Sequence, residues 1–159
     1  MHRSRIAALI ALAGLSSGCF STLPLDATDS HRPDAAQHSL GSVSLHSERL
    51  GQATIAPTAC QAGDRAFFLG GDFIDEHAGL DVRFVLDPLE GPALRIFARD
   101  APVEKSTVFH RGDCHVMKYS FTPTNWRIND VFDYRISVAF ECAKAGDAAS
   151  GELSAAHCH

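Results

Sequence analysis

The fold class of this chain is decided by residues 131–142, VFDYRISVAFEC. Apolar or aromatic side chains alternate with mostly polar ones along this run, and six consecutive positions follow the same rule. A period of two predicts a β-strand with one buried face and argues against a helix. The predicted buried face holds Phe132, Tyr134, Ile136, Val138, Phe140 and Cys142, and the opposite face holds Asp133, Arg135, Ser137 and Glu141.

A second run, residues 80–87, alternates in the same way and ends at Pro88. Turn-forming Gly, Pro, Asn and Asp residues punctuate the rest of the chain, and no amphipathic helical period appears between them. Weaker candidate strands are residues 42–47, 66–69, 94–99, 107–110, 115–121 and 152–157. We therefore expect an all-β domain over residues 42–159, a single antiparallel sandwich or barrel of seven or eight strands.

Length and composition fit one globular domain with a segment attached. The chain has 159 residues, of which 45% are hydrophobic and 21% charged, which excludes a disordered or fibrous protein. The longest apolar run, residues 6–15, is shorter than the roughly 18 residues of a membrane-spanning helix, so a polytopic membrane protein is excluded. A formal charge of -5 and scattered basic residues give no electrostatic basis for nucleic-acid binding.

The N-terminus is typical of an export signal. Arg3 and Arg5 precede the apolar run, and residues 1–18 have the layout of a signal peptide. The sequence Leu15-Ser16-Ser17-Gly18-Cys19 resembles the lipobox of bacterial lipoproteins, although Ser16 stands where that family usually has leucine. The resemblance implies acylation of Cys19, for example by palmitate, and a membrane anchor. Phe20, in place of the aspartate that retains such proteins in the inner membrane, favours the outer membrane.

The alternative is an ordinary cleaved signal peptide, with Cys19 left to form a disulfide. Residues 19–41 are predicted to be the lipidated cysteine and a flexible linker, because they are rich in Ser, Asp, Thr, Ala and Pro without any apolar period. A flexible linker of this length has a typical reach of about 25 Å.

Four cysteines follow the linker, namely Cys60, Cys114, Cys142 and Cys158. An exported chain with an even number of cysteines is expected to form disulfides, and four cysteines allow three pairings. Cys60 or Cys114 is slightly favoured as the partner of Cys142. The placement of Cys19, Cys60 and Cys142 also resembles the layout of the mycobacterial 19-kilodalton lipoprotein antigen family, which implies a surface-displayed β-domain without catalytic activity.

Nine histidines raise the alternative of a metal-binding lipoprotein. Imidazole is a preferred ligand of zinc and copper, and four histidines could converge if two strand ends met. No paired CxxC unit is present, and disulfide formation would consume the thiolates. The candidate ligands are His110, His115, His157 and His159.

Other motifs give weaker indications of function. Residues 70–81, GGDFIDEHAGLD, predict a solvated acidic loop around Asp75 rather than a calcium site, and such a loop would be the place to look for inhibition of a partner enzyme. The tripeptide Arg111-Gly112-Asp113 is typical of integrin ligands but is also ordinary turn chemistry. Phe73, Trp126 and Phe132 are candidates for a ligand-binding face, with Trp126 expected in the core.

No sequence motif for nucleophilic, phosphate-binding or metalloprotease chemistry is present. We therefore expect a non-enzymatic binding or structural module of an envelope lipoprotein, without a cofactor, whose partner is an envelope protein or a glycan.

Overall fold

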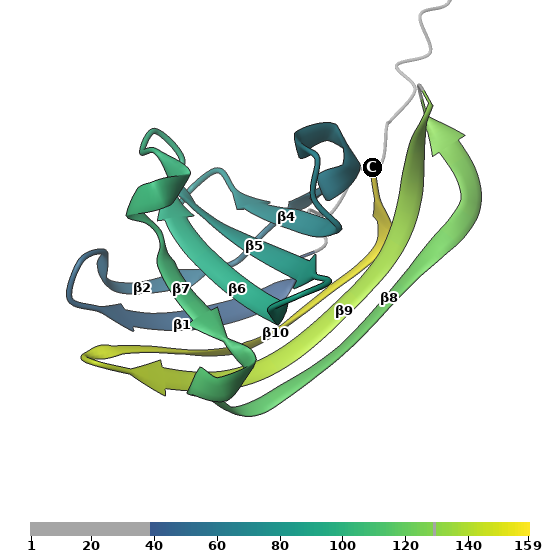
Figure 1. The fold of residues 1–159 in the computed structure, drawn as a ribbon. Coiled ribbons are helices and arrows are strands. Elements are labelled where there is room, and N and C mark those ends of the chain that lie inside the picture. Colours follow the sequence, from purple (N-terminus) through teal and green to yellow (C-terminus); the bar gives the residue numbers. More distant parts are fainter. Residues whose placement is uncertain (1–38, 129) are drawn as a thin grey trace, which may run out of the picture. The chain divides into compact units, whose positions relative to one another are not determined.

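The computed structural model describes residues 39–128 and 130–159 (Figure 1). The predicted signal peptide, Cys19 and the linker up to residue 38 lie outside the described residues. Ser39 and Leu40 precede the first strand, which begins at Gly41, the last residue of the predicted linker. Within the described part of the chain, no helix is long and apolar enough to cross a membrane.

The described residues form ten strands and three short 3-10 turns, so the all-β prediction is confirmed while the expected number of strands is too low. The strands are β1 (Gly41–Ser47), β2 (Gly51–Ile55), β3 (Ala59–Ala62), β4 (Gly70–Asp75), β5 (Leu80–Asp87), β6 (Gly91–Ala98), β7 (Thr107–His110), β8 (Cys114–Ile128), β9 (Val131–Lys144) and β10 (Asp147–Cys158). The 3-10 turns are η1 (Gly63–Ala66), η2 (Val103–Lys105) and η3 (Arg111–Asp113).

Two five-stranded antiparallel sheets make up the fold. One sheet has the strand order β2-β1-β10-β9-β8, and the other has the order β3-β4-β5-β6-β7. The chain begins in the first sheet, crosses to the second at β3, meanders through it and returns at β8. Every pair of hydrogen-bonded strands is consecutive in sequence except one. That exception is the pairing of the first strand, β1, with the last strand, β10.

The core lies between the inner faces of the two sheets. In β9, Tyr134, Ile136, Val138, Phe140 and Cys142 are all buried, which confirms the period of two read from residues 131–142. Side chains from the other sheet, such as Phe73 and Phe84, join them in one apolar cluster. Two positions depart from the predicted alternation, because Phe132 remains 36% exposed and Asp133, expected on the polar face, is 1% exposed.

Strands β2, β3 and β4 were not predicted, and β4 was missed because its glycine pair does not mark a turn. Gly70 and Gly71 begin β4. A Cβ atom on Gly71 would lie 2.6 Å from Ile136 Cδ1 and 3.0 Å from Cys158 Sγ, so glycine lets this strand approach the opposite sheet closely. Residues 66–69, expected as a strand, instead belong to the end of η1 and the loop that follows it.

The four cysteines after the linker form two disulfides, as expected of an exported chain. Cys114 in β8 is bonded to Cys142 in β9, which confirms Cys114 as one of the two favoured partners, and Cys60 is bonded to Cys158. The second bond ties β3 of one sheet to β10 of the other, so it links the two layers of the sandwich.

Candidate functional site

The four candidate metal ligands do not lie together. Cys114, next to His115, pairs with Cys142 of β9, whereas Cys158, next to His157, pairs with Tyr134. Eight residues of β9 separate these two positions, about 26 Å of strand. Within residues 39–128 and 130–159, no group of three or more His, Cys, Asp or Glu side chains is arranged to hold a metal ion.

The predicted acidic loop is instead the hairpin formed by β4 and β5. Asp72 accepts two hydrogen bonds from Arg83, at 2.7 and 2.8 Å, and Asp81 accepts two from Arg99, at 2.9 and 3.5 Å. Asp75 is buried and accepts hydrogen bonds from the backbone N–H groups of Ala56, His77 and Ala78. Burial alone would raise the pKa of Asp75, but these hydrogen bonds outweigh burial and lower the pKa below its ordinary value.

The Arg111-Gly112-Asp113 tripeptide forms the turn η3. The carboxylate of Asp113 accepts a hydrogen bond from the backbone N–H of His110 at 2.9 Å and lies 3.8 Å from Lys144 Nζ. The aspartate that an integrin ligand would present is therefore already engaged within the domain.

The three candidate aromatic residues have different positions. Phe73 is fully buried in the core, so its expected place in a ligand-binding face is wrong. Trp126 is 68% exposed, so the expectation that it packs in the core is also wrong. Phe132 is partly exposed and also lies near the tip of the β8–β9 hairpin.

A bulge in β8 accounts for the exposure of Trp126. Pro123 pairs with Tyr134 and Arg127 pairs with Phe132, so the three residues from Thr124 to Trp126 lie opposite the single residue Asp133. The extra residues bend the strand and turn the indole outward.

The bulge is fixed by the buried carboxylate of Asp133. This side chain is 1% exposed and accepts hydrogen bonds from Thr124 Oγ1 at 2.8 Å and from the backbone N–H of Cys158 at 2.9 Å. The Nδ1 atom of His157 lies 2.8 Å from the same carboxylate. Burial alone would raise the pKa of Asp133, but the hydrogen bonds to its carboxylate have a larger effect and lower the pKa below its ordinary value.

An apolar groove of about 500 Å³ lies between β8 and two loops of the other sheet. The side of the groove formed by β8 is lined by Tyr119, which is 47% exposed. The centroid of its ring lies 5.3 Å from the centroid of the Phe84 ring. The loop side is lined by residues that are predominantly apolar. These are Phe67, Phe68, Leu69, Val85, Leu86, Asp87, Pro88, Gly91 and Pro92.

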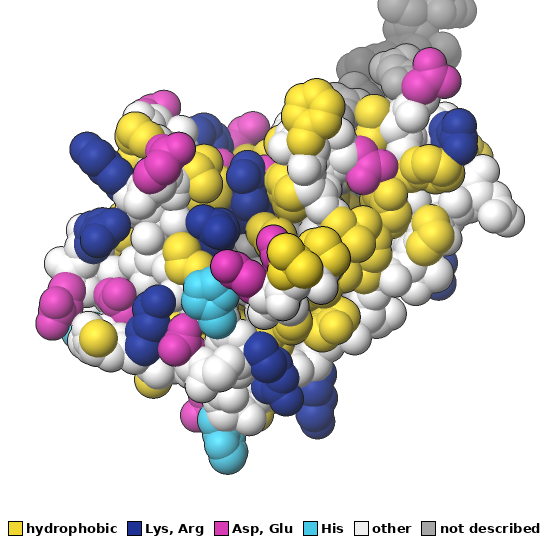
Figure 2. Space-filling view, in the orientation of Figure 1, with side chains coloured by type: hydrophobic (Ala, Val, Ile, Leu, Met, Phe, Trp, Pro, Cys, Tyr) yellow, Lys and Arg dark blue, Asp and Glu magenta, His cyan; other side chains and the backbone are white. Residues whose placement is uncertain are grey.

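The groove continues an exposed apolar band. In Figure 2, hydrophobic side chains form this band from the β8–β9 hairpin across the middle of the view. Phe67 and Leu89 project almost completely into solvent, at 99% and 94% exposure, and Leu69 is 46% exposed. A monomeric domain rarely leaves large apolar side chains gathered in this way unless they contact something.

The backbone around Phe67 holds this side chain outward. Phe67 ends η1 in the left-handed region, with φ of 61°, which is uncommon for a bulky residue. The ring of the next residue, Phe68, packs so close to Gly63 that a Cβ atom there would collide with it. A hydrogen bond of 2.7 Å from the Leu86 N–H to the Leu69 carbonyl then fixes the loop beside the β5–β6 turn.

The edge of the first sheet runs beside the groove. β8 has 15 residues and is the last strand of its sheet, so no strand among the described residues pairs with its outer edge. Long edge strands are templates for pairing with another chain, and proteins usually shorten or cover them. In β8 the protective features are Pro123, the charged side chains of Lys118 and Arg127, and two bulges, one after Cys114 and one after Pro123.

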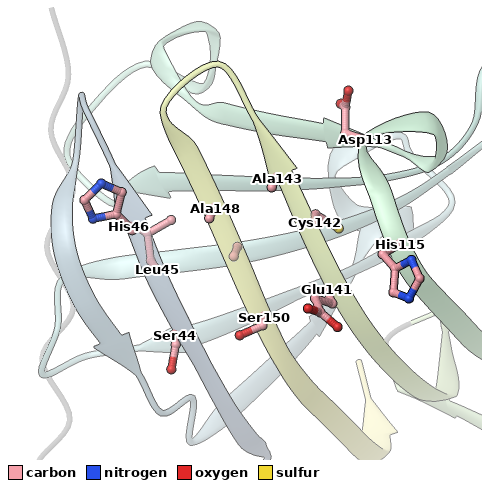
Figure 3. Close-up of a pocket in the computed structure, with 11 residues that line it drawn as sticks. Ser44, Leu45, His46, Asp113, His115, Glu141, Cys142, Ala143, Ala148 and Ser150 are labelled. Atoms are coloured by element: carbon pink, nitrogen blue, oxygen red, sulfur yellow. The ribbon is translucent and has the colours of Figure 1, made fainter.

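A second hollow, of about 550 Å³, lies on the outer face of the first sheet (Figure 3). Its floor is made of small residues on β1, β9 and β10, including Ser44, Ser150 and Ala148. Imidazole and carboxylate groups stand at its rim, and His46 Nδ1 lies 3.0 Å from Gln52 Nε2. The remaining titratable residues of the rim are Asp113, His115 and Glu141.

A third, smaller hollow lies at the β8–β9 hairpin and has a volume of about 290 Å³. It is lined by Trp126, Asn125, Arg135 and His157, together with Thr122, Pro123 and Thr124.

No protein-family model, no curated protein and no solved structure matches this chain. The groove residues Phe67, Leu69 and Tyr119, and the adjoining Leu89, were not identified from the sequence. One signal was available, because Leu89 is an apolar residue inside the turn sequence Asp87-Pro88-Leu89-Glu90-Gly91, where polar residues are usual.

Proposed function

We propose that this chain is a lipid-anchored protein of the bacterial cell envelope, held at the outer membrane through Cys19, and that its β-domain binds an extended apolar segment of a partner protein without catalysing a reaction. The lipobox-like sequence from Leu15 to Cys19 supports the anchor. Two disulfides in the domain agree with an oxidising compartment outside the cytoplasm.

The observation that supports binding best is the position of the apolar groove beside the unpaired edge of β8. An added strand would form backbone hydrogen bonds with this edge, and every second side chain of that strand could enter the groove. Tyr119 is the β8 residue that lines the groove, so it would contact such a segment directly.

The buried carboxylates favour a structural rather than a catalytic role. Asp75 and Asp133 both accept hydrogen bonds from backbone N–H groups, and each fixes a turn or a bulge. The two salt-bridged acids, Asp72 and Asp81, lie on strands and hold neighbouring arginines. The hydrogen bonds and salt bridges of these acids therefore explain their positions, and no substrate is needed to explain them.

The anchor is tested by labelling bacteria with a palmitate analogue. We expect the full-length protein to carry the label and the Cys19→Ser variant to lose it. Continued labelling of the Cys19→Ser variant, or an unlabelled wild-type protein, would overturn the anchor.

The groove is tested by titrating the protein with a synthetic extended peptide in which valine and threonine alternate, followed by amide chemical shifts. We expect shifts along β8 and the loops around Leu69 and Leu89, and a weaker response in the Tyr119→Ser variant. Lys118→Ser is the matched control, because Lys118 is the neighbouring residue on β8 and points to the opposite face of the sheet, where its cross-strand partner is Ala139 of β9. Equal loss of binding in both variants, or shifts away from β8, would contradict the proposed site.

A further inference from the structure

Three exposed aromatic residues lie at one end of the domain, and we define them as the aromatic end. They are Phe67 at 99% exposure, Trp126 at 68% and Phe132 at 36%. Figure 1 shows η1, the C-terminus and the tip of the β8–β9 hairpin at this end. The hydroxyl of Tyr134 donates a 2.9 Å hydrogen bond to Asp64 of η1, which joins the loop of Phe67 to the strand of Phe132.

A different local feature of the fold holds each of these side chains outward. Phe67 is turned out by its left-handed backbone at the end of η1. Trp126 is turned out by the bulge, which Thr124 and Asp133 fix through their hydrogen bond. The guanidinium of Arg127 lies 4.0 Å from the centre of the Phe132 ring and so packs along that side chain. Neither Phe67 nor Trp126 belongs to the core cluster, so core packing does not explain their presence.

The segment that leads to Cys19 joins the domain near this same end. The carbonyl of Leu40 accepts a hydrogen bond from the Ser154 N–H at 2.7 Å. Ser154 lies four residues before Cys158 on β10, about 13 Å along the strand, and Cys158 pairs with Tyr134. Twenty residues separate Cys19 from Ser39, a distance of about 70 Å when fully extended and about 25 Å for the flexible linker predicted from their composition.

We propose that the aromatic end docks on the surface of the bilayer to which Cys19 anchors the chain. This inference rests on the proposed anchor. Tryptophan and other aromatic side chains favour the interface between headgroups and acyl chains, where a ring meets an apolar layer and water at once. A short tether gives the domain a high effective concentration near that surface, so weak insertion of a few side chains is enough to hold the domain there.

The net charge of the chain determines which kind of lipid surface the domain can dock on. Residues 19–159 have 12 Lys and Arg against 19 Asp and Glu, a formal charge of -7 that disfavours anionic headgroups, so docking is to zwitterionic lipid and weakens as anionic lipid is added. The basic residues Arg127 and Arg135 lie at the hairpin beside Trp126, where they can meet the phosphates of zwitterionic headgroups.

Trp126 is the single tryptophan of the chain, so its fluorescence reports the position of the aromatic end directly. The chain from Cys19 to His159 is prepared without lipid and coupled through the Cys19 thiol to maleimide lipid in phosphatidylcholine vesicles, which supplies the anchor independently of acylation in the cell. Bromine atoms on the acyl chains near the headgroups quench only a tryptophan that reaches the interface.

We expect bromolipid to quench Trp126 emission by about twofold, and the Phe67→Ser and Phe132→Ser changes together to remove most of that quenching. The control is Tyr119→Ser, because Tyr119 lies seven residues along β8, about 23 Å from Trp126, and belongs to the groove. This control should quench like the wild type. Emission unchanged by bromolipid, or quenching unaffected by the double change, would overturn docking.

Failure of docking and failure of the proposed function have different signatures. An absent palmitate label in cells together with normal quenching in vesicles overturns the anchor and leaves the docking surface intact. A labelled protein whose Trp126 is not quenched overturns the docking surface and leaves the anchor intact.

Discussion

The β8–β9 hairpin has two halves that differ in what covers them. In one half, Met117, Val138 and Phe140 face the other sheet and are at most 5% exposed. In the other half, towards the tip, Phe132 and Trp126 are 36% and 68% exposed. Apolar residues are present in both halves, so their presence alone does not decide burial. Burial depends on whether a second layer lies opposite, and the aromatic side chains of the uncovered half are the ones that we propose dock on the bilayer.

The largest effect on stability is expected from the disulfide that links the two sheets. Replacing Cys60 and Cys158 by alanine opens a cross-link that spans 98 residues, whereas replacing Cys114 and Cys142 opens one that spans 28. The longer loop gains more chain entropy on unfolding, so we expect losses of about 4 to 5 and about 3 to 4 kcal/mol. Denaturant unfolding followed by circular dichroism measures both. A larger loss for the Cys114–Cys142 pair would contradict the account.

Aromatic truncation separates the two halves next. Phe140→Ala removes a buried ring and should lower the free energy of unfolding by about 3 to 5 kcal/mol. Phe132→Ala removes a partly exposed ring and should cost less than about 1 kcal/mol. The two variants are measured by the same denaturant method. Similar losses would mean that the tip of the hairpin is packed as tightly as its base.

A smaller, pH-dependent effect is expected for Asp133→Asn. The folded-state pKa of Asp133 is below its unfolded value of about 3.9, so its contribution is fully present above about pH 4 and is lost as the pH falls through the folded-state pKa. The variant should be about 1 to 3 kcal/mol less stable near neutral pH and less sensitive to acid than the wild type.

Asp75→Asn is the matched comparison, because Asp75 is also a buried carboxylate with a lowered pKa but lies away from the hairpin, in the β4–β5 turn. Both variants should lose stability near neutral pH, but only Asp133→Asn should speed amide hydrogen exchange at the β8 bulge. Faster exchange of the bulge in Asp75→Asn would contradict the assigned role of Asp133.

The alternating runs were predictable from sequence because their side chains report burial directly. Residues 131–142 gave β9 and residues 80–87 gave β5, and residues 107–110 matched β7. β2 was missed because GQATI has too few apolar residues to show a period, and the first half of β10, DAASG, is made of small or polar residues. Such strands are defined by their hydrogen-bonded neighbours and not by their own composition.

The candidate site was less predictable than the fold. Trp126 is exposed because two extra residues of β8 bulge opposite Asp133, and no local pattern in the sequence marks that bulge. Phe67 is exposed because η1 ends in a left-handed conformation, which depends on the packing of Phe68 against Gly63. The pairing of four cysteines likewise needed the register of the sheets, which single-chain spacing does not determine.

The smallest effect on stability is expected for Leu89→Ser. Leu89 is 94% exposed, so the free energy of unfolding should change by less than about 0.5 kcal/mol. The same change should reduce the fluorescence of a hydrophobic dye bound to the protein, because Leu89 adjoins the groove. Unchanged dye fluorescence would show that the band around the groove is not an accessible apolar surface.

We propose that a partner strand binds at the edge of β8 beside the groove. Amide hydrogen exchange tests it most directly, because the four edge strands β2, β3, β7 and β8 can be compared in one protein with and without the alternating valine–threonine peptide. We expect slower exchange for β8 amides and unchanged exchange for the other three edges. Equal protection of all four edges, or protection of any edge except β8, would contradict it.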